Sequence, residues 1–227
     1  MWLDVTLVLL IPAIILSIYA QFKVQSTFKK FSRVSSSSNL TGAELASRLL
    51  QAGGLGRVPV EYIPGNLSDH YDPTQRVLRL SDSVYGNTSV AALGVAAHEV
   101  GHAFQHQEGY VPLQVRNAIV PVANFASTAS FPLLLIGLIF NWLDLVWLGA
   151  LLFTGVVLFQ IITLPVEFNA SHRAVALLGR GGYLDSGEIP MVRKVLAAAA
   201  LTYVAAAIMS LANLLRFVVL AAMGGEE

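Results

Sequence analysis

The chain of 227 residues contains no cysteine. Disulfide bonds are therefore excluded, and so is every metal site that uses a thiolate ligand. A metal site in this protein would have to be built from histidine, aspartate and glutamate side chains.

Charged residues are also scarce. They make up 12% of the chain, whereas 55% of the residues are hydrophobic, and the mean hydropathy is +0.64. A soluble domain of this length carries more charge and less apolar surface. The 14 Lys and Arg residues balance the 14 Asp and Glu residues, so the chain lacks the basic surface that binds nucleic acid. The composition predicts an integral membrane protein.

Four apolar stretches are long enough to cross a bilayer, whose hydrocarbon core of about 30 Å needs about 20 residues of helix. They are Trp2–Phe22, Ile119–Phe140, Leu145–Pro165 and Val195–Met223. We expect a mainly α-helical protein with a transmembrane anchor (1–22), a transmembrane helical hairpin (119–165) and a final transmembrane helix (195–223), with two polar segments (23–118 and 166–194) between them.

The positive charges predict the orientation of the chain. Because a short connector joins the second and third spans, both polar segments lie on one side of the membrane. Thirteen of the 14 Lys and Arg residues fall in these two segments, many of them close to the ends of spans. Such residues mark the cytoplasmic side, so both polar segments are expected in the cytoplasm.

The first polar segment has the pattern of a small α+β domain. Thr41 and Glu44 have the spacing of a capping box, which predicts a short helix that continues to about Ala52. Val58–Ile63 and Arg76–Leu80 are rich in β-forming residues. We expect them to form a hairpin with Asp69, His70 and Asp72 near its tip, and the second strand could hold an extended peptide substrate beside the domain.

The sequence "HEVGH" at 98–102 carries the strongest chemical signal. The stretch from Asn87 to Glu108 contains no proline and predicts one helix, on which residues four apart share a face. His98 and His102 can therefore bind one metal ion, while Glu99 is placed to act as a base on a water molecule. The alternative is a pair of hydrogen-bonded histidines with no metal.

A catalytic zinc site has three protein ligands and one water, so a third ligand is needed. The pattern that continues to a glycine and a third histidine is excluded, because Gln105 and Glu108 occupy those two positions. Glu167 is the best candidate, since it follows the third span at the membrane interface, where a buried carboxylate needs a cation. His172 remains an alternative ligand.

The surroundings of Glu167, "PVEFNASHRA", are similar to the Glu-x-x-x-Asp element of metallopeptidases whose third ligand is a downstream glutamate. Ser171 stands where that element has aspartate, so Asn169 or Ser171 would have to orient a ligating histidine here.

The chain resembles the YugP-type neutral zinc metallopeptidases of bacterial membranes and, more distantly, the HtpX-type membrane metallopeptidases. The resemblance rests on four spans and on "SDHYDP", "HEVGHAFQH" and "LPVEFNASHRA" in this order. It implies a bacterial membrane zinc peptidase. Together with the motif and the charge pattern, it leads us to expect a zincin-like domain, one Zn²⁺ per chain and a multi-pass protein of the inner membrane whose active site faces the cytoplasm.

The leading hypothesis is a zinc endopeptidase that cleaves membrane-associated or cytoplasmic proteins. His98, His102 and Glu167 would bind zinc, and Glu99 would be the catalytic base. Membrane lipid would surround the spans, and nucleic acid is not an expected partner. Two alternatives are an intramembrane protease, in which the "HEVGH" helix lies in the bilayer, and a non-catalytic membrane scaffold with a metal site.

Overall fold

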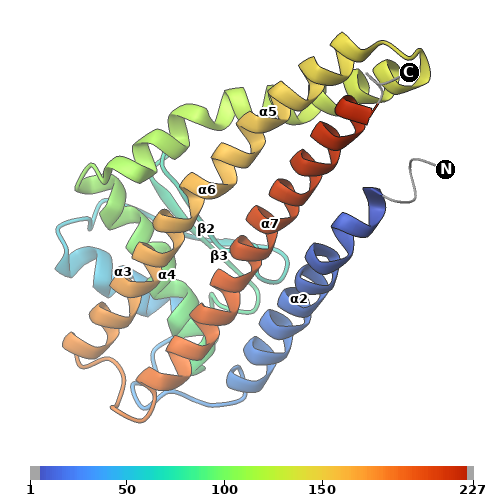
Figure 1. Ribbon diagram of the computed structural model, residues 1–227. Coiled ribbons are helices and arrows are strands. Elements are labelled where there is room, and N and C mark those ends of the chain that lie inside the picture. Colours follow the sequence, from blue (N-terminus) through green and yellow to red (C-terminus); the bar gives the residue numbers. More distant parts are fainter. Residues whose placement is uncertain (1–5, 224–227) are drawn as a thin grey trace. The chain divides into compact units, whose positions relative to one another are not determined.

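The computed structural model describes residues 6–223. Four long helices dominate it (Figure 1): α2 (Ile11–Phe31, preceded by a 3-10 turn at Val8–Leu10), α5 (Val111–Ile139), α6 (Leu143–Arg180) and α7 (Ile189–Met223). Each is long and apolar enough to cross a membrane, which confirms the four predicted helices. Trp2, at the predicted start of the first span, lies outside the described residues.

The helices extend beyond the apolar stretches that the sequence marked. α2 continues to Phe31, and α6 passes through Pro165 without interruption and ends at Arg180. α7 begins at Ile189, before the apolar stretch starts. Hydropathy locates the part of a helix that suits lipid, whereas the helix itself ends where its backbone hydrogen bonding stops.

The chain divides into two compact units. The first comprises residues 6–21, 114–165 and 202–223 of the described chain. Its interior includes Leu134, Val146, Phe153 and Phe217, and the rings of Phe153 and Phe217 meet edge to face at 5.1 Å. Many of its large apolar side chains point outward, such as Leu151, which is 69% exposed. Such a surface suits lipid rather than water.

The second unit combines two distant parts of the chain, Phe22–Leu113 and Val166–Leu201. Its core joins α3 (Gly42–Ala52) and α4 (Val90–Gln107) to the ends of α6 and α7 that belong to this unit. The predicted capping box is present: Thr41 accepts a hydrogen bond from the backbone of Glu44, whose carboxylate accepts one from the backbone of Thr41. The two segments predicted to share one side of the membrane thus fold together.

The sheet differs from the predicted hairpin. It has three strands, β1 (Val60–Ile63), β2 (His70–Asp72) and β3 (Val77–Ser81), in the order β1-β3-β2. β1 and β3 are neighbours but run parallel, whereas β2 pairs with β3 in antiparallel fashion. The hairpin prediction was wrong because the polar residues assigned to its tip contain a strand of their own.

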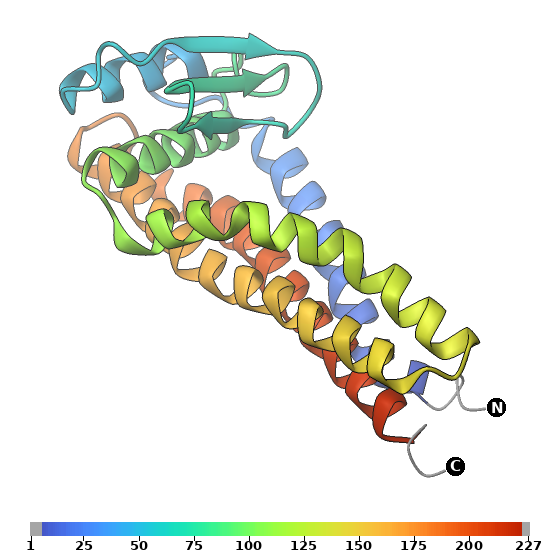
Figure 2. The same cartoon turned by 90° about the horizontal axis from the view of Figure 1, so that it is seen from above.

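Helix α4 lies between the sheet and the ends of α6 and α7 in this unit (Figure 2). Ser89 caps its first turn by accepting a hydrogen bond from the backbone of Ala92. A Cβ atom on Gly101 would lie 2.8 Å from the carbonyl oxygen of Ala170 on α6. Only glycine lets the two backbones approach this closely, so the glycine of "HEVGH" sets the distance between α4 and α6.

Candidate metal centre

Three side chains meet where α4 faces α6. His98 Nε2 lies 3.2 Å and His102 Nε2 lies 3.6 Å from the same oxygen, Glu167 Oε2. Their potential ligand atoms all lie within 4.8 Å of one another. The side chains are 13%, 12% and 5% exposed, respectively. The structure therefore brings together, within a single unit, the three residues predicted to bind the metal.

The local helix geometry explains how Glu167 reaches the histidines. Val166, Ala170 and Ala174 recur at four-residue spacing on α6, and all three are fully buried. Small residues at this spacing let α6 pack closely on α4, and Glu167 projects from the next position.

Burial would lower the pKa of His102, but the carboxylates of Glu167 and Glu99 raise it above its ordinary value. The negative charge gathered here favours a cation.

The outer nitrogen of each histidine also has a partner. His102 Nδ1 lies 3.0 Å from Gln105 Oε1, and His98 Nδ1 lies 3.2 Å from Ser171 Oγ. A carbonyl oxygen can only accept, so Nδ1 of His102 carries a hydrogen, and a metal ion would bind at Nε2 in place of a proton. This is the tautomer that a metal ligand needs.

Gln105 is fixed by hydrogen bonds at both of its amide atoms. It is fully buried, and its nitrogen donates to the carbonyl oxygen of Val166 at 2.8 Å and to Asn169 Oδ1 at 2.9 Å. Arg173 Nε also donates to Asn169 Oδ1, at 2.7 Å, and its guanidinium makes a two-pronged ion pair with Glu108. These contacts connect α4 to α6 beside the histidines.

The expectation for this outer layer was therefore incomplete. Ser171 contacts His98, whereas Asn169 acts through Gln105 rather than on a histidine directly. The sequence analysis considered Gln105 only as a residue that excludes another zinc pattern. The signal that could have identified it is a glutamine about one turn after His102, on the helix face that carries both histidines.

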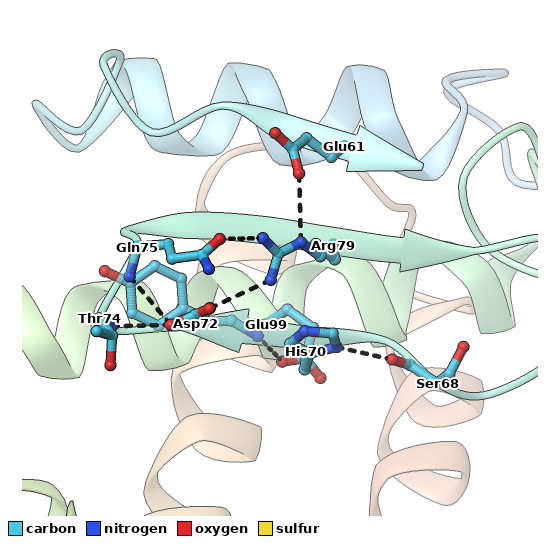
Figure 3. Close-up of polar contacts among 9 residues, drawn as sticks. Glu61, Ser68, His70, Asp72, Thr74, Gln75, Arg79 and Glu99 are labelled. Atoms are coloured by element: carbon cyan, nitrogen blue, oxygen red, sulfur yellow. Dashed lines mark hydrogen bonds and ion pairs between the residues drawn. The ribbon is translucent and has the colours of Figure 1, made fainter. Parts of the chain in front are cut away.

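Glu99, which follows His98 on α4, is 8% exposed, and its charge helps to raise the pKa of His102. Its carboxylate accepts a hydrogen bond of 3.0 Å from the backbone N–H of Tyr71 on β2 (Figure 3). Burial, together with the charge of Glu99, raises the pKa of Asp69 despite hydrogen bonds from Ser81. The edge strand of the sheet thus holds the carboxylate next to the cluster.

The turn between β2 and β3 fixes the position of this strand. Asp72 accepts hydrogen bonds from the backbones of Thr74 and Gln75 at 2.8 and 3.0 Å. Arg79 on β3 bonds Asp72 on one side and Glu61 on β1 on the other, both at 3.2 Å (Figure 3). A polar row across all three strands therefore keeps β2 in register.

The remaining candidates lie elsewhere in the unit. His172 is exposed and does not join the cluster found among residues 6–223. His70 is exposed and contacts the backbone of Ser68, while His106 bonds the hydroxyl of Tyr71. The prediction that the strand near Arg76–Leu80 holds the substrate was wrong, because this strand, β3, is the central one and has no free edge. β2 is the edge strand that contacts Glu99.

Replacing Gln105 with methionine should weaken metal binding, because His102 would lose the acceptor that fixes its tautomer. Losses of this kind are typically about 10- to 100-fold in metal affinity. Zinc affinity is measured by competition with a chromophoric chelator, and Gln51→Met, an exposed position on α3, is the matched control. An affinity of Gln105→Met within about twofold of the wild type would contradict a positioning role.

Comparisons with known proteins show the family of the chain. The family described as "putative neutral zinc metallopeptidase" matches residues 6–222. The chain is 54% identical over 219 residues to a Bacillus subtilis (strain 168) protein called "putative membrane protease YugP", covering 96% of this chain and 97% of that protein. No solved structure matches. With four helices suited to a bilayer and a close membrane relative, this is a membrane protein, and it belongs to the neutral zinc metallopeptidase family.

Proposed function

We propose that the protein is a zinc-dependent endopeptidase of the membrane. The observation that carries this proposal is the convergence of two imidazole Nε2 atoms on one carboxylate oxygen. The buried carboxylate of Glu99 acts electrostatically on one of the two imidazoles, that of His102. The relative's printed name, which describes a membrane protease, supports the same activity.

The donor set suits zinc. Two neutral histidines and one glutamate are the protein ligands of a well-known class of catalytic zinc sites, which leave a fourth position for water. A structural zinc site is usually closed by four protein ligands, often with cysteine, and this chain has no cysteine. The partners of both Nδ1 atoms leave each Nε2 directed at the shared carboxylate oxygen. The donors therefore favour catalysis over the scaffold alternative.

The residues divide the catalytic work. Zinc bound by His98, His102 and Glu167 would lower the pKa of its water to about 7 and polarise the scissile carbonyl group. Glu99 would take the proton of the attacking water and transfer it to the leaving amine. The Tyr71 N–H bond holds the Glu99 carboxylate in place for both transfers.

The substrate would bind as an extended segment of a membrane-associated or cytoplasmic protein. β2 is the edge strand of the sheet, and its Tyr71 already contacts the catalytic carboxylate. A peptide that adds to this edge passes directly beside Glu99.

Replacing Glu99 with glutamine should abolish cleavage and leave zinc bound, because the amide cannot accept the proton. The loss of a general base typically lowers the rate by about 10² to 10⁴-fold. Cleavage of a quenched fluorescent peptide and zinc content are measured on the same preparation. Asp185→Asn, an exposed change in the turn before α7, is the control. Full activity in Glu99→Gln would refute this mechanism.

The active site should face the cytoplasm of a bacterial cell, at the inner membrane. Thirteen of the 14 Lys and Arg residues lie in the two segments that the spans leave on one side. Among the described residues, α4 is not one of the helices suited to a bilayer, and it packs on the sheet and α3. Both observations favour a site outside the hydrocarbon over an intramembrane protease.

Reporter fusions after Ser35 and after Gly182 test this orientation. Both should report the cytoplasm, because each follows a span end rich in positive charge. Reporters on opposite sides of the membrane would instead support the intramembrane alternative.

A further inference from the structure

A pocket of about 400 Å³ lies in the second unit. It is formed by the turn after α3, by β2 with its following turn, and by the last turns of α4. The polar side chains that line it are Arg57, Tyr71, Arg76, His106 and Gln107.

One residue joins this pocket to the catalytic group. The backbone N–H of Tyr71 donates to Glu99, and the hydroxyl of the same residue lies 2.9 Å from Nδ1 of His106. His106 follows His102 by one helical turn on α4. A ligand in this pocket would therefore lie against Tyr71, which also bonds the proposed base, and against His106, which is one helical turn from the proposed metal ligand His102.

The lining is positively charged. Arg57 and Arg76 both contribute to the wall, and none of the lining residues in the described chain is acidic. The carboxylate of Asp72, which follows Tyr71 in the chain, is already held by two backbone N–H groups and Arg79. The hydroxyl of Tyr71 and the imidazole of His106, which hydrogen-bond each other at 2.9 Å, are further polar groups in the wall. Donors and positive charge together suit a carboxylate.

The backbone at Arg76 supports a role for its side chain. Arg76 adopts a left-handed conformation with φ 53° in the turn between β2 and β3. Residues other than glycine, asparagine and aspartate rarely adopt this conformation. An arginine at a position better suited to glycine, and facing a pocket, is a sign of function rather than of folding.

We propose that this pocket, lined by Arg57, Arg76, Tyr71 and His106, is a specificity site that binds a carboxylate of the peptide substrate. The inference rests on the proposed peptidase function and narrows its substrate class. The carboxylate comes either from an aspartate or glutamate side chain near the scissile bond or from the free C-terminus of the peptide.

Cleavage-site profiling tests the proposal and separates the two sources. The full-length, zinc-loaded protein in detergent is incubated with a mixed peptide library, once with free C-termini and once with amidated C-termini. An acidic side chain at one fixed position from the cut identifies the first source. Cuts at a fixed distance from a free C-terminus, lost on amidation, identify the second. A peptide that carries the preferred carboxylate should be cleaved about tenfold better, in kcat/KM, than its amide counterpart.

Charge reversal at the pocket provides the decisive variant. Arg57→Glu combined with Arg76→Asp, which suits the left-handed backbone, should remove the preference for the carboxylate peptide and favour a lysine-containing one. Arg48→Ala, an exposed arginine on α3, is the control and should keep the preference. A wild-type profile indifferent to carboxylates, or an unchanged preference in the reversed variant, would overturn this inference alone. Failure to cleave any peptide would overturn the proposed function as well.

Discussion

The close approach of α4 to α6 at Gly101 and Ala170 is the contact on which the rest of the site depends. α4 carries two histidines and a glutamate, but these residues become a three-ligand cluster only when a second helix supplies a carboxylate. Glycine on one helix and alanine on the other allow a backbone separation at which Glu167 reaches both Nε2 atoms. α6 continues from an apolar stretch into the second unit, so one continuous helix carries both lipid-facing residues and a proposed metal ligand.

The outer layer of the site contacts His102 through an amide, Gln105, and His98 through a hydroxyl, Ser171. Gln105 accepts a hydrogen bond from His102, and its amide nitrogen donates hydrogen bonds to Val166 and Asn169 on α6. An amide in this position can bond both helices at once, because it has an acceptor and two donors. The ion pair of Arg173 with Glu108 closes the same set of contacts near the surface. The geometry of His102 and the packing of α4 on α6 are therefore supported by the same side chains.

Most of the correct predictions came from local sequence patterns. Apolar length predicted four long helices, the Thr41 capping box predicted α3, and helical spacing placed His98 beside His102. The sheet could not be predicted in the same way. β1 pairs with β3 although β2 lies between them in the sequence, and no local sequence pattern indicates such a pairing. Gln105 was missed for a similar reason: its three partners include two on α6, more than 60 residues further along the chain. The arrangement of side chains from distant segments depends on packing, which a single sequence does not display.

The central claim is that His98, His102 and Glu167 bind one zinc ion, and metal content tests it most directly. Wild type, Glu167→Ala and His172→Ala are purified without chelators and analysed by mass spectrometry of the metals. The account predicts one zinc per chain in wild type and in His172→Ala, and its loss in Glu167→Ala. Zinc retained by Glu167→Ala, or no zinc in the wild-type protein, would contradict it.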